Sequence, residues 1–456
     1  MKLPGALYII LTAFLILTGI YNSITPYREP GILRFQRMQD PVTGRMVPQT
    51  ANDIGAPDER QHANYISHLT SSKGFPVLKV GDPEAYENYQ SHQPPLYYII
   101  SAGWSKITGA DPADPNAGFR LRFLNSIIGL AGLLGIYFAG IWGLQRQDIA
   151  LAATAFAALL PMNVALHSAI SNDPLLYALV TWVFALSVKG LQQGWSLKLA
   201  LMIGALTGLA ILTKTTGLVC LPVVGVALLM RDPDPERRPK NAAVIWAAAL
   251  GTGILIALPW LLRNKGIYGD FLAVSVFNAA FTGSPQASTF IEMFGPQGYW
   301  LNMVLWWTAR SFIGAFGYMD IFLFDSMRTD QSGALYCAIF LITAGIALFG
   351  QLGFKEIKAE ADDQALPHPK RFQLLHLVLL AFTTILFIRF NLQYFQGQAR
   401  YLFPAMVSFA YLFAFGAVRL MKSKPELAYL VPAIFLGLLN FAAIQSITSG
   451  FPLRQP

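Results

Sequence analysis

Two neighbouring carboxylates and a histidine stand close together in residues 57–62, which read Pro-Asp-Glu-Arg-Gln-His. A proline followed by two acids is typical of a helix start, where carboxylates interact favourably with the positive end of the helix dipole. In such a helix Asp58 and His62 share one face. A carboxylate in this setting can take a proton from an attacking hydroxyl group. The same pattern also fits a solvated amphipathic helix that is capped by an aspartate.

A second polar cluster occupies residues 87–98, which read Glu-Asn-Tyr-Gln-Ser-His-Gln-Pro-Pro-Leu-Tyr-Tyr. Glu87, His92 and Gln93 come just before two prolines that begin an apolar helix. Polar groups at such a junction can face a lipid headgroup or a substrate carried by a lipid. An ordinary interfacial anchor with aromatic side chains is the alternative.

Basic side chains stand at the ends of several apolar segments. Lys214 lies in a turn between two of them, Arg263 ends one, Arg400 precedes another, and Arg120 and Arg122 precede one more. Each long side chain could simply reach back to the membrane surface. Together, beside an acidic loop, they indicate a site for an anionic ligand where lipid meets water.

Residues 171–174, Ser-Asn-Asp-Pro, open a further apolar segment. Asp173 is expected to cap a helix there, with Pro174 in the first turn. The histidines lack the HxxxH and HExxH spacings of metal sites, so we assign no metal ligand and no cofactor, and a divalent ion stays an alternative.

These groups must be positioned by membrane-spanning helices. The 456 residues are 54% hydrophobic and only 13% charged, about half the charge of soluble domains. The sequence predicts an all-α polytopic integral membrane protein with a single membrane domain, residues 1–456. About eleven apolar runs are long enough to cross a bilayer: 5–24, 120–142, 149–167, 174–191, 196–213, 215–231, 241–262, 333–352, 373–389, 401–418 and 426–447. The first is read as an uncleaved span.

Two more apolar segments, 93–108 and 298–319, are interrupted by polar residues. We expect them to be amphipathic helices in the membrane interface, although counting them as spans would raise the number to thirteen. Within the span 196–213, Gly204 and Gly208 predict a seam where another helix packs closely.

Lysine and arginine are concentrated in alternate loops, which places Lys2 in the cytoplasm. Two long loops, 25–119 and 263–332, then face the extracytoplasmic side, and the first carries the acids. The net charge of +8 is spread over helix ends rather than gathered in one patch, so no nucleic-acid partner is expected.

The ordered motifs resemble the GT-C superfamily of polytopic membrane glycosyltransferases, in particular an uncharacterised bacterial branch related to the protein mannosyltransferase and aminoarabinose-transferase families. The matching pieces cover nearly the whole chain. They are Pro57-Asp58-Glu59-x-x-His62, His92-Gln93-Pro94-Pro95-Leu96-Tyr97-Tyr98, Arg122-x-x-Asn125, Ser171-Asn172-Asp173, Leu212-Thr213-Lys214-x-x-Gly217, Arg263-Asn264-x-x-x-Tyr268-Gly269-Asp270, Ser311-Phe312-x-Gly314-x-Phe316-Gly317 and Gln398-Ala399-Arg400-Tyr401-Leu402-x-Pro404.

This resemblance implies an enzyme that uses a polyprenyl-phosphate-linked sugar on the outer side of the bacterial cytoplasmic membrane. It implies Asp58 as the catalytic carboxylate, with Glu59 as its neighbour or substitute. Lys214, Arg263 and Arg400 would hold the lipid phosphate. Further substrate-binding residues would be His62, His92, Gln93, Arg122, Asn172 and Tyr401. One departure concerns Arg400, because the branch usually reads Gln-Gly-Arg-Tyr, whereas Gln398-Ala399 here separate Gln396-Gly397 from Arg400-Tyr401.

Displacement at a sugar C1 needs a base near the acceptor hydroxyl and cations near the departing phosphate. One carboxylate suffices for this direct route, which predicts inversion at the anomeric carbon. The partners expected are the donor lipid, membrane lipid and a glycan, lipid or protein acceptor. A transporter or flippase of a lipid-linked glycan is the first alternative, although transporters usually place polar residues at mid-membrane and show repeated halves. A non-catalytic scaffold for envelope assembly is the second.

Overall fold

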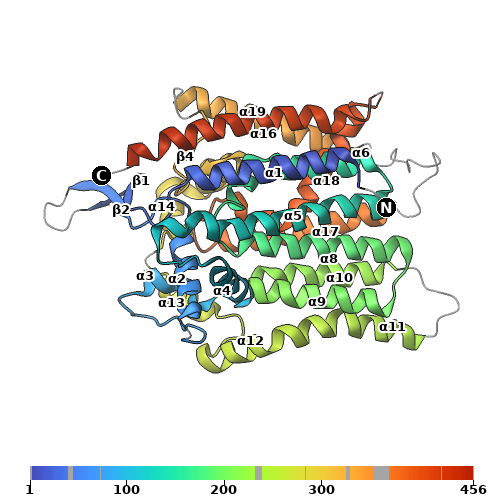
Figure 1. The fold of residues 1–456 in the computed structure, drawn as a ribbon, viewed down its shortest axis with the longest axis horizontal. Coiled ribbons are helices and arrows are strands. Elements are labelled where there is room, and N and C mark those ends of the chain that lie inside the picture. The colour runs from blue at the N-terminus through green and yellow to red at the C-terminus, as the bar shows by residue number, and fades with distance from the viewer. Residues whose placement is uncertain are drawn as a thin grey trace.

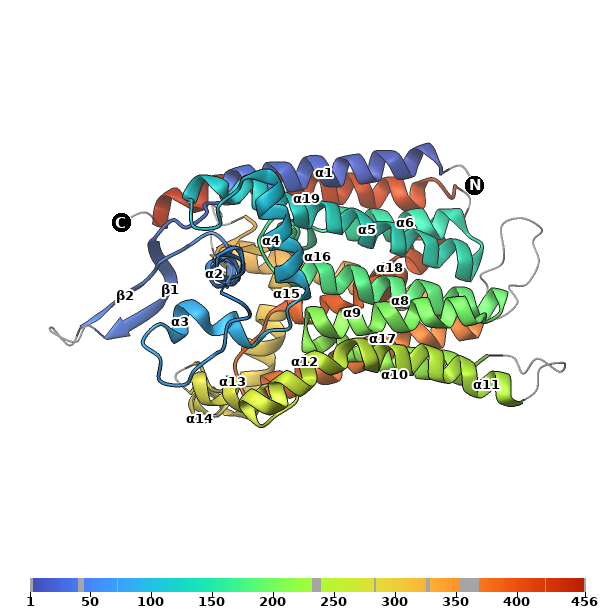
Figure 2. The ribbon, with the colours of Figure 1, turned by 60° about the horizontal axis from the view of Figure 1, so that its bottom comes forward.

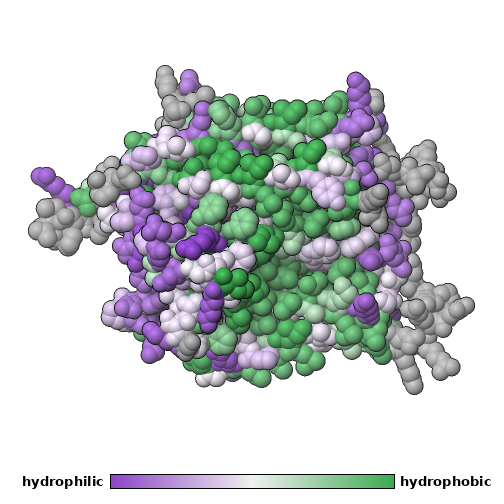
Figure 3. Space-filling model, viewed as in Figure 1, coloured by the Kyte–Doolittle hydropathy of each residue, from purple (hydrophilic) through white to green (hydrophobic). Residues whose placement is uncertain are grey.

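The computed structural model describes residues 3–39, 45–71, 73–231, 239–282, 284–324, 329–352, 369–422 and 424–454. Long helices run side by side along one axis, and shorter elements gather at one end of the bundle (Figures 1 and 2). The middle of the surface seen in Figure 3 is predominantly hydrophobic, whereas hydrophilic residues concentrate toward both ends. A belt of this kind is expected for a protein that crosses a bilayer.

Eight helices of the described chain are long and apolar enough to cross a membrane. The elements that form them are α1 (Gly5–Ile24), α5 (Gly118–Leu144), α8 (Asp173–Gln193), the continuous run of α11 (Pro239–Trp246), η4 (Ala247–Gly251) and α12 (Thr252–Tyr268), then α16 (Thr329–Leu352), α17 (Pro369–Asn391), η8 (Phe403–Ala405) with α18 (Met406–Leu420), and α19 (Leu427–Gly450) with η9 (Pro452–Arg454). Three apolar helices are shorter: α6 (Gln147–Leu159), α9 (Leu197–Thr213) and the pair η3 (Thr215–Val219) and α10 (Cys220–Leu229). The predicted polytopic helical class is confirmed.

The predicted span 149–167 is wrong as one continuous helix. Helix α6 ends at Leu159, and the short α7 (Pro161–Leu166) begins after Leu160, whose backbone is extended. Proline has no N–H to continue the helical ladder and biases the residue before it toward extended geometry, so the helix stops and restarts here. The break leads the chain into residues 167–172 at the end of the bundle where the shorter elements lie.

Neither of the two extra apolar segments forms a helix long enough to cross a membrane. Residues 93–108 contain α4 (Leu96–Thr108), which lies across the direction of the long helices in Figure 2. Residues 298–319 hold the π-helical η5 (Tyr299–Leu305), α15 (Trp306–Ile313) and the strand β3 (Ala315–Phe316), which pairs with β4 (Ile321–Phe322). The orientation of α4 fits the expected interfacial position.

The two loops predicted to share one side do lie at the same end of the bundle (Figure 1). The first loop contributes an antiparallel hairpin, so the expectation of an all-α chain missed two small sheets. The remaining elements of this end are β1 (Gly31–Gln39), β2 (Met46–Ala51), α2 (Glu59–Thr70), α3 (Ala85–Asn88), η1 (Tyr89–His92), η2 (Pro115–Ala117), α13 (Val274–Ala280), α14 (Ala287–Gly298) and η7 (Ala399–Tyr401).

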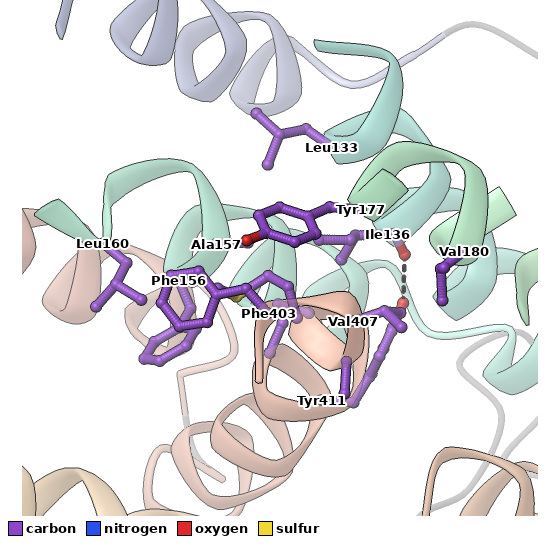
Figure 4. Close-up of a cluster of buried hydrophobic side chains, with 14 of the residues drawn as sticks. Leu133, Ile136, Phe156, Ala157, Leu160, Tyr177, Val180, Phe403, Val407 and Tyr411 are labelled. Atoms are coloured by element: carbon purple, nitrogen blue, oxygen red, sulfur yellow. Dashed lines mark hydrogen bonds between the residues drawn. The ribbon is translucent and has the colours of Figure 1, made fainter. Parts of the chain in front are cut away.

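Apolar side chains of α5, α6, α8 and α18 pack together inside the bundle. Figure 4 shows Ile136, Phe156, Tyr177 and Tyr411 meeting there, and the Tyr411 hydroxyl donates to the Ile136 carbonyl over 2.5 Å. The predicted small-residue seam is confirmed, because a Cβ at Gly208 would lie 2.7 Å from a side-chain atom of Ile256 on α12.

Candidate active site

A cavity of about 1000 Å³ opens among the elements at this end of the bundle. Eight of the eleven predicted site residues line it: Asp58, His62, His92, Gln93, Asn172, Lys214, Arg400 and Tyr401. Other parts of its wall are apolar and include Phe277 and Phe281 from the α13 region and Leu386, Phe387 and Phe390 from α17. Because α17 is a candidate span, the cavity places charged groups beside apolar side chains at the Asn391 end of a helix that could cross a membrane.

Asp58 stands immediately before α2, not inside it as the sequence pattern predicted. Its backbone is left-handed, with φ of 67°, and its carboxylate does not cap the helix. Instead, Arg400 Nη2 donates to Asp58 Oδ2 over 2.6 Å, and the Tyr89 hydroxyl donates to Oδ1. A strained non-glycine residue of this kind is held in place by its surroundings and is common at functional sites.

The pKa of Asp58 lies below its usual value. Burial alone would raise the pKa of this carboxyl, but the Arg400 guanidinium and the Tyr89 hydrogen bond outweigh that effect. Asp58 is therefore an ionised carboxylate near neutral pH, and its side chain keeps 28% of its surface exposed.

Glu59 has a different environment from Asp58. It is fully buried and accepts two hydrogen bonds from Arg122, 2.7 and 2.6 Å long, and a third from the Ile170 backbone N–H over 2.7 Å. Arg122 also donates to backbone carbonyls at the end of α1, including Thr25 over 2.7 Å. Neither side chain lines the cavity, so this geometry gives no support to catalysis by Glu59 or to substrate binding by Arg122.

Lys214 follows α9 and donates to Asp173 Oδ1 over 2.6 Å. Both residues line the cavity. The expectation that Asp173 caps α8 is wrong, because Asn172 occupies the cap position and the Asp173 carboxylate pairs with Lys214. The lysine ammonium also lies 5.8 Å from the centre of the Tyr401 ring. The Lys214–Asp173 ion pair thus adjoins Tyr401, the residue that follows Arg400 in the chain.

Arg400 belongs to the short turn η7, which is fixed by buried contacts. Tyr177 donates to the Arg400 carbonyl over 2.7 Å, and the Ala399 N–H donates to Ser311 Oγ over 2.9 Å. The two-residue spacer Gln398-Ala399 therefore does not prevent Arg400 from reaching Asp58. Nη2 of Arg400 also contacts the Tyr401 hydroxyl at 3.1 Å. The Nε atom of Arg400 is buried and has no hydrogen-bond partner in the described chain.

Arg263 does not join this cluster. Its guanidinium lies 4.3 Å from the centre of the Trp260 ring and donates to the Pro76 carbonyl over 2.9 Å. The side chain does not line the cavity. Arg263 thus ties α12 to the first loop, and its predicted role at the lipid phosphate has no support in the geometry.

The two histidines of the cavity differ in what their ring nitrogens contact. His92 Nδ1 lies 2.6 Å from the Tyr89 carbonyl, and its Nε2 lies 3.1 Å from the amide nitrogen of Gln93. His62 Nδ1 lies 2.8 Å from the Tyr98 hydroxyl. Burial lowers the pKa of His62 to about 3 and that of His92 to about 4, so both are neutral. In the described chain, no group of three or more His, Cys, Asp or Glu side chains could hold a metal ion.

Sequence reasoning missed Tyr89 and the pairing of Asp173. Tyr89 belongs to the polar cluster of residues 87–98, three residues before His92, but nothing in the sequence around it predicts that its hydroxyl reaches Asp58. The Ser-Asn-Asp-Pro pattern predicts a capping role for Asp173, and no local signal indicates its partner Lys214, which is 41 residues away in sequence.

Residues 92–262 match the model of the dolichyl-phosphate-mannose-protein mannosyltransferase family. No curated protein matches the chain by sequence. Among solved structures, ArnT from Cupriavidus metallidurans, determined with bound undecaprenyl phosphate, is similar with a TM-score of 0.58 and 14% identity, over 98% of this chain and 78% of that one. The oligosaccharyltransferase AglB from Archaeoglobus fulgidus, determined with an inhibitory peptide and a dolichol-phosphate, gives 0.51 and 14%, over 97% of this chain and 55% of its own.

This chain therefore spans about half the length of the archaeal protein. At 14% sequence identity, these two structures show that the fold is shared. The structural likenesses confirm the predicted multi-pass GT-C fold, and the family match relates residues 92–262 in sequence to the protein mannosyltransferases.

Proposed function

We propose that the chain transfers a sugar from a polyprenyl-phosphate-linked donor to an acceptor hydroxyl, with Asp58 as general base. The observation that carries the proposal is the lining of one cavity by Asp58, Lys214 and Arg400 together with apolar side chains of the candidate span α17. A donor with a charged phosphate and a long apolar tail needs both kinds of surface at one boundary.

The cations support departure of the phosphate. When the bond between sugar C1 and the phosphate oxygen breaks, negative charge grows on the leaving group. The side chains of Lys214 and Arg400 are largely buried, with 17% and 9% of their surfaces exposed, and fixed positive charge in such a setting stabilises a growing negative charge more than it would in bulk solvent. Lys214 pairs with Asp173, and Arg400 pairs with Asp58. A bound phosphate would therefore replace these carboxylates as the partner of each cation.

The exchange of partners at Arg400 also changes the basicity of Asp58. In the absence of phosphate, Arg400 occupies Oδ2 of Asp58 and lowers its proton affinity. A phosphate that draws Arg400 away would free Oδ2 and make the carboxylate more basic. The acceptor oxygen then forms a bond to C1, its proton passes to Asp58, and the polyprenyl phosphate leaves. A single displacement of this type inverts the anomeric configuration.

The proposed location is the bacterial cytoplasmic membrane, with the cavity on the extracytoplasmic side. The concentration of basic residues in alternate loops supports this orientation. The gathering of both long loops at one end of the bundle agrees with it. The acceptor is a glycan, a lipid or a protein.

The test compares wild-type protein with Asp58→Asn in nanodiscs, using a panel of polyprenyl-phosphate monosaccharides. For a transferase, release of polyprenyl phosphate should fall at least about a hundredfold in the variant. Its affinity for undecaprenyl phosphate should stay equal or rise, because Arg400 loses its competing carboxylate. The control is Asp82→Asn, which makes the same charge change at an exposed position outside the cavity lining.

Four results would contradict the proposal or a part of it. Release unchanged by Asp58→Asn would exclude Asp58 as the base. Movement of intact donor lipid across the membrane without cleavage would favour the transporter. Absence of any binding to polyprenyl phosphates would favour the scaffold. A product with retained anomeric configuration would remove the single-displacement mechanism while leaving the transferase.

A further inference from the structure

One ring nitrogen of His62 has no hydrogen-bond partner among the residues that the structure describes. Its Nδ1 meets the Tyr98 hydroxyl at 2.8 Å, whereas no partner for Nε2 is found in the described chain. The ring itself is 97% buried, since only 3% of the residue is exposed, and it lines the cavity. His92, the other histidine of the cavity, has contacts on both nitrogens. Nε2 of His62 is therefore available to a ligand.

The contact with Tyr98 fixes which nitrogen of His62 carries the hydrogen. Tyr98 is fully buried, and its hydroxyl has His62 Nδ1 as its hydrogen-bond partner in the described chain. If Nδ1 donated to the hydroxyl oxygen, the hydroxyl hydrogen would be buried without an acceptor, which is costly. The favourable arrangement has Tyr98 donating to Nδ1. The hydrogen of the neutral ring then lies on Nε2, which becomes a donor.

The charged groups around His62 come from four different segments. Asp58 precedes its own helix α2, Asp173 begins α8, Lys214 follows α9, and Arg400 lies in η7. All four act electrostatically on the imidazole. The ring thus lies within electrostatic reach of the Asp58–Arg400 and Asp173–Lys214 pairs, and it lines the same cavity as the two cations that would meet a phosphate.

We propose that His62 donates a hydrogen bond from Nε2 to the phosphate of the lipid-linked donor, as a neutral imidazole whose tautomer Tyr98 fixes. The inference rests on the proposed function and adds a phosphate-binding group to it. A neutral donor strengthens phosphate binding without adding a third positive charge beside Asp58. Such a charge would lower the proton affinity of the base further.

The experiment measures binding of undecaprenyl phosphate and of undecaprenol, which lacks the phosphate, to full-length protein in nanodiscs. Because His62→Leu alone would orphan the Tyr98 hydroxyl, the main variant is the double change His62→Leu/Tyr98→Phe, which removes both partners. It should bind undecaprenyl phosphate about tenfold more weakly and undecaprenol as well as the wild type does. His62→Gln, whose amide nitrogen can donate from a similar position, should recover part of the loss.

Two controls separate this role from packing. Tyr98→Phe alone keeps the imidazole and should cost little phosphate affinity, while His68→Gln repeats the substitution on the same helix outside the cavity and should change nothing. The inference is overturned if the double variant binds the phosphate lipid normally, or if both lipids weaken equally. A loss of turnover with unchanged phosphate affinity also overturns it, since His62 would then act on the acceptor. If wild-type protein does not prefer the phosphate lipid, the proposed function itself is wrong.

Discussion

The carboxylates of Asp58 and Glu59, adjacent in sequence, bind different arginines in different environments. Asp58 pairs with Arg400 at the cavity and keeps 28% of its side chain exposed, whereas Glu59 pairs with Arg122 and is fully buried. The left-handed backbone of Asp58 costs of order 1–3 kcal/mol and needs neighbouring contacts to hold it. The three hydrogen bonds of Glu59 supply such contacts at the next residue. We therefore expect Glu59 to position Asp58 rather than to serve as the base in its place.

Removing Glu59 should therefore destabilise the protein. Glu59→Ala leaves Arg122 buried without its carboxylate, which should cost about 3–5 kcal/mol and lower the melting temperature in detergent. The double change Glu59→Leu/Arg122→Leu should recover much of that loss, because no buried charge is left unpaired. Glu87→Gln is the matched control, since its pair with Arg60 is about one quarter exposed and contributes little. A well-folded, inactive Glu59→Gln protein would instead show that Glu59 acts in the chemistry.

Asp53, in the first loop, should make the stability of the folded protein depend on pH. Burial raises the pKa of Asp53 to about 6, and the charge of Glu59 adds to this, while the N–H groups of Gly55 and Arg28 oppose it. A carboxyl whose pKa is raised in the native state binds its proton more tightly there than in the unfolded chain. It therefore stabilises the native state fully at pH values below the usual pKa of 3.8, and this contribution is lost as the pH rises through about 6. About two pKa units correspond to roughly 3 kcal/mol.

We therefore expect the melting temperature of wild-type protein to fall, relative to Asp53→Asn, as pH rises from 4 to 7. The difference between the two proteins isolates Asp53 from the other carboxylates, and Asp82→Asn, at an exposed position, should track the wild type. Parallel curves for wild type and Asp53→Asn across this range would show that the carboxyl has an ordinary pKa.

The membrane helices could be predicted from sequence because a bilayer requires long apolar runs, and each predicted run contains an apolar helix. The site could be predicted only by residue type. Arg122, Arg263 and Arg400 all stand near the ends of apolar runs, yet only Arg400 lines the cavity. Which face of a helix an arginine occupies, and which distant loop meets it, depends on tertiary packing. Asp58 and Arg400, 342 positions apart in the chain, meet only in the fold.

Lys214 and Arg400 should act on one phosphate rather than on separate ligands, because both lie against Tyr401 and each is paired with a carboxylate of the same cavity. The test is a double-mutant cycle with Lys214→Gln and Arg400→Gln, measured as affinity for undecaprenyl phosphate. Removing either cation alone would expose its carboxylate to the phosphate, so the cycle is built on an Asp58→Asn/Asp173→Asn background. In that background repulsion from Asp58 and Asp173 cannot be mistaken for a lost contact.

Groups that bind one phosphate are coupled, so the losses should fail to add by about 1 kcal/mol, or roughly fivefold in affinity. Arg263→Gln serves as the control, because Arg263 is held by Trp260 and by carbonyls of the first loop outside the cavity lining. Arg263→Gln should leave the affinity for undecaprenyl phosphate nearly unchanged. Its small effect on the binding free energy should add to that of Lys214→Gln or of Arg400→Gln. Strict additivity of Lys214→Gln and Arg400→Gln would mean that the two cations bind different groups, and the single-phosphate geometry would have to be abandoned.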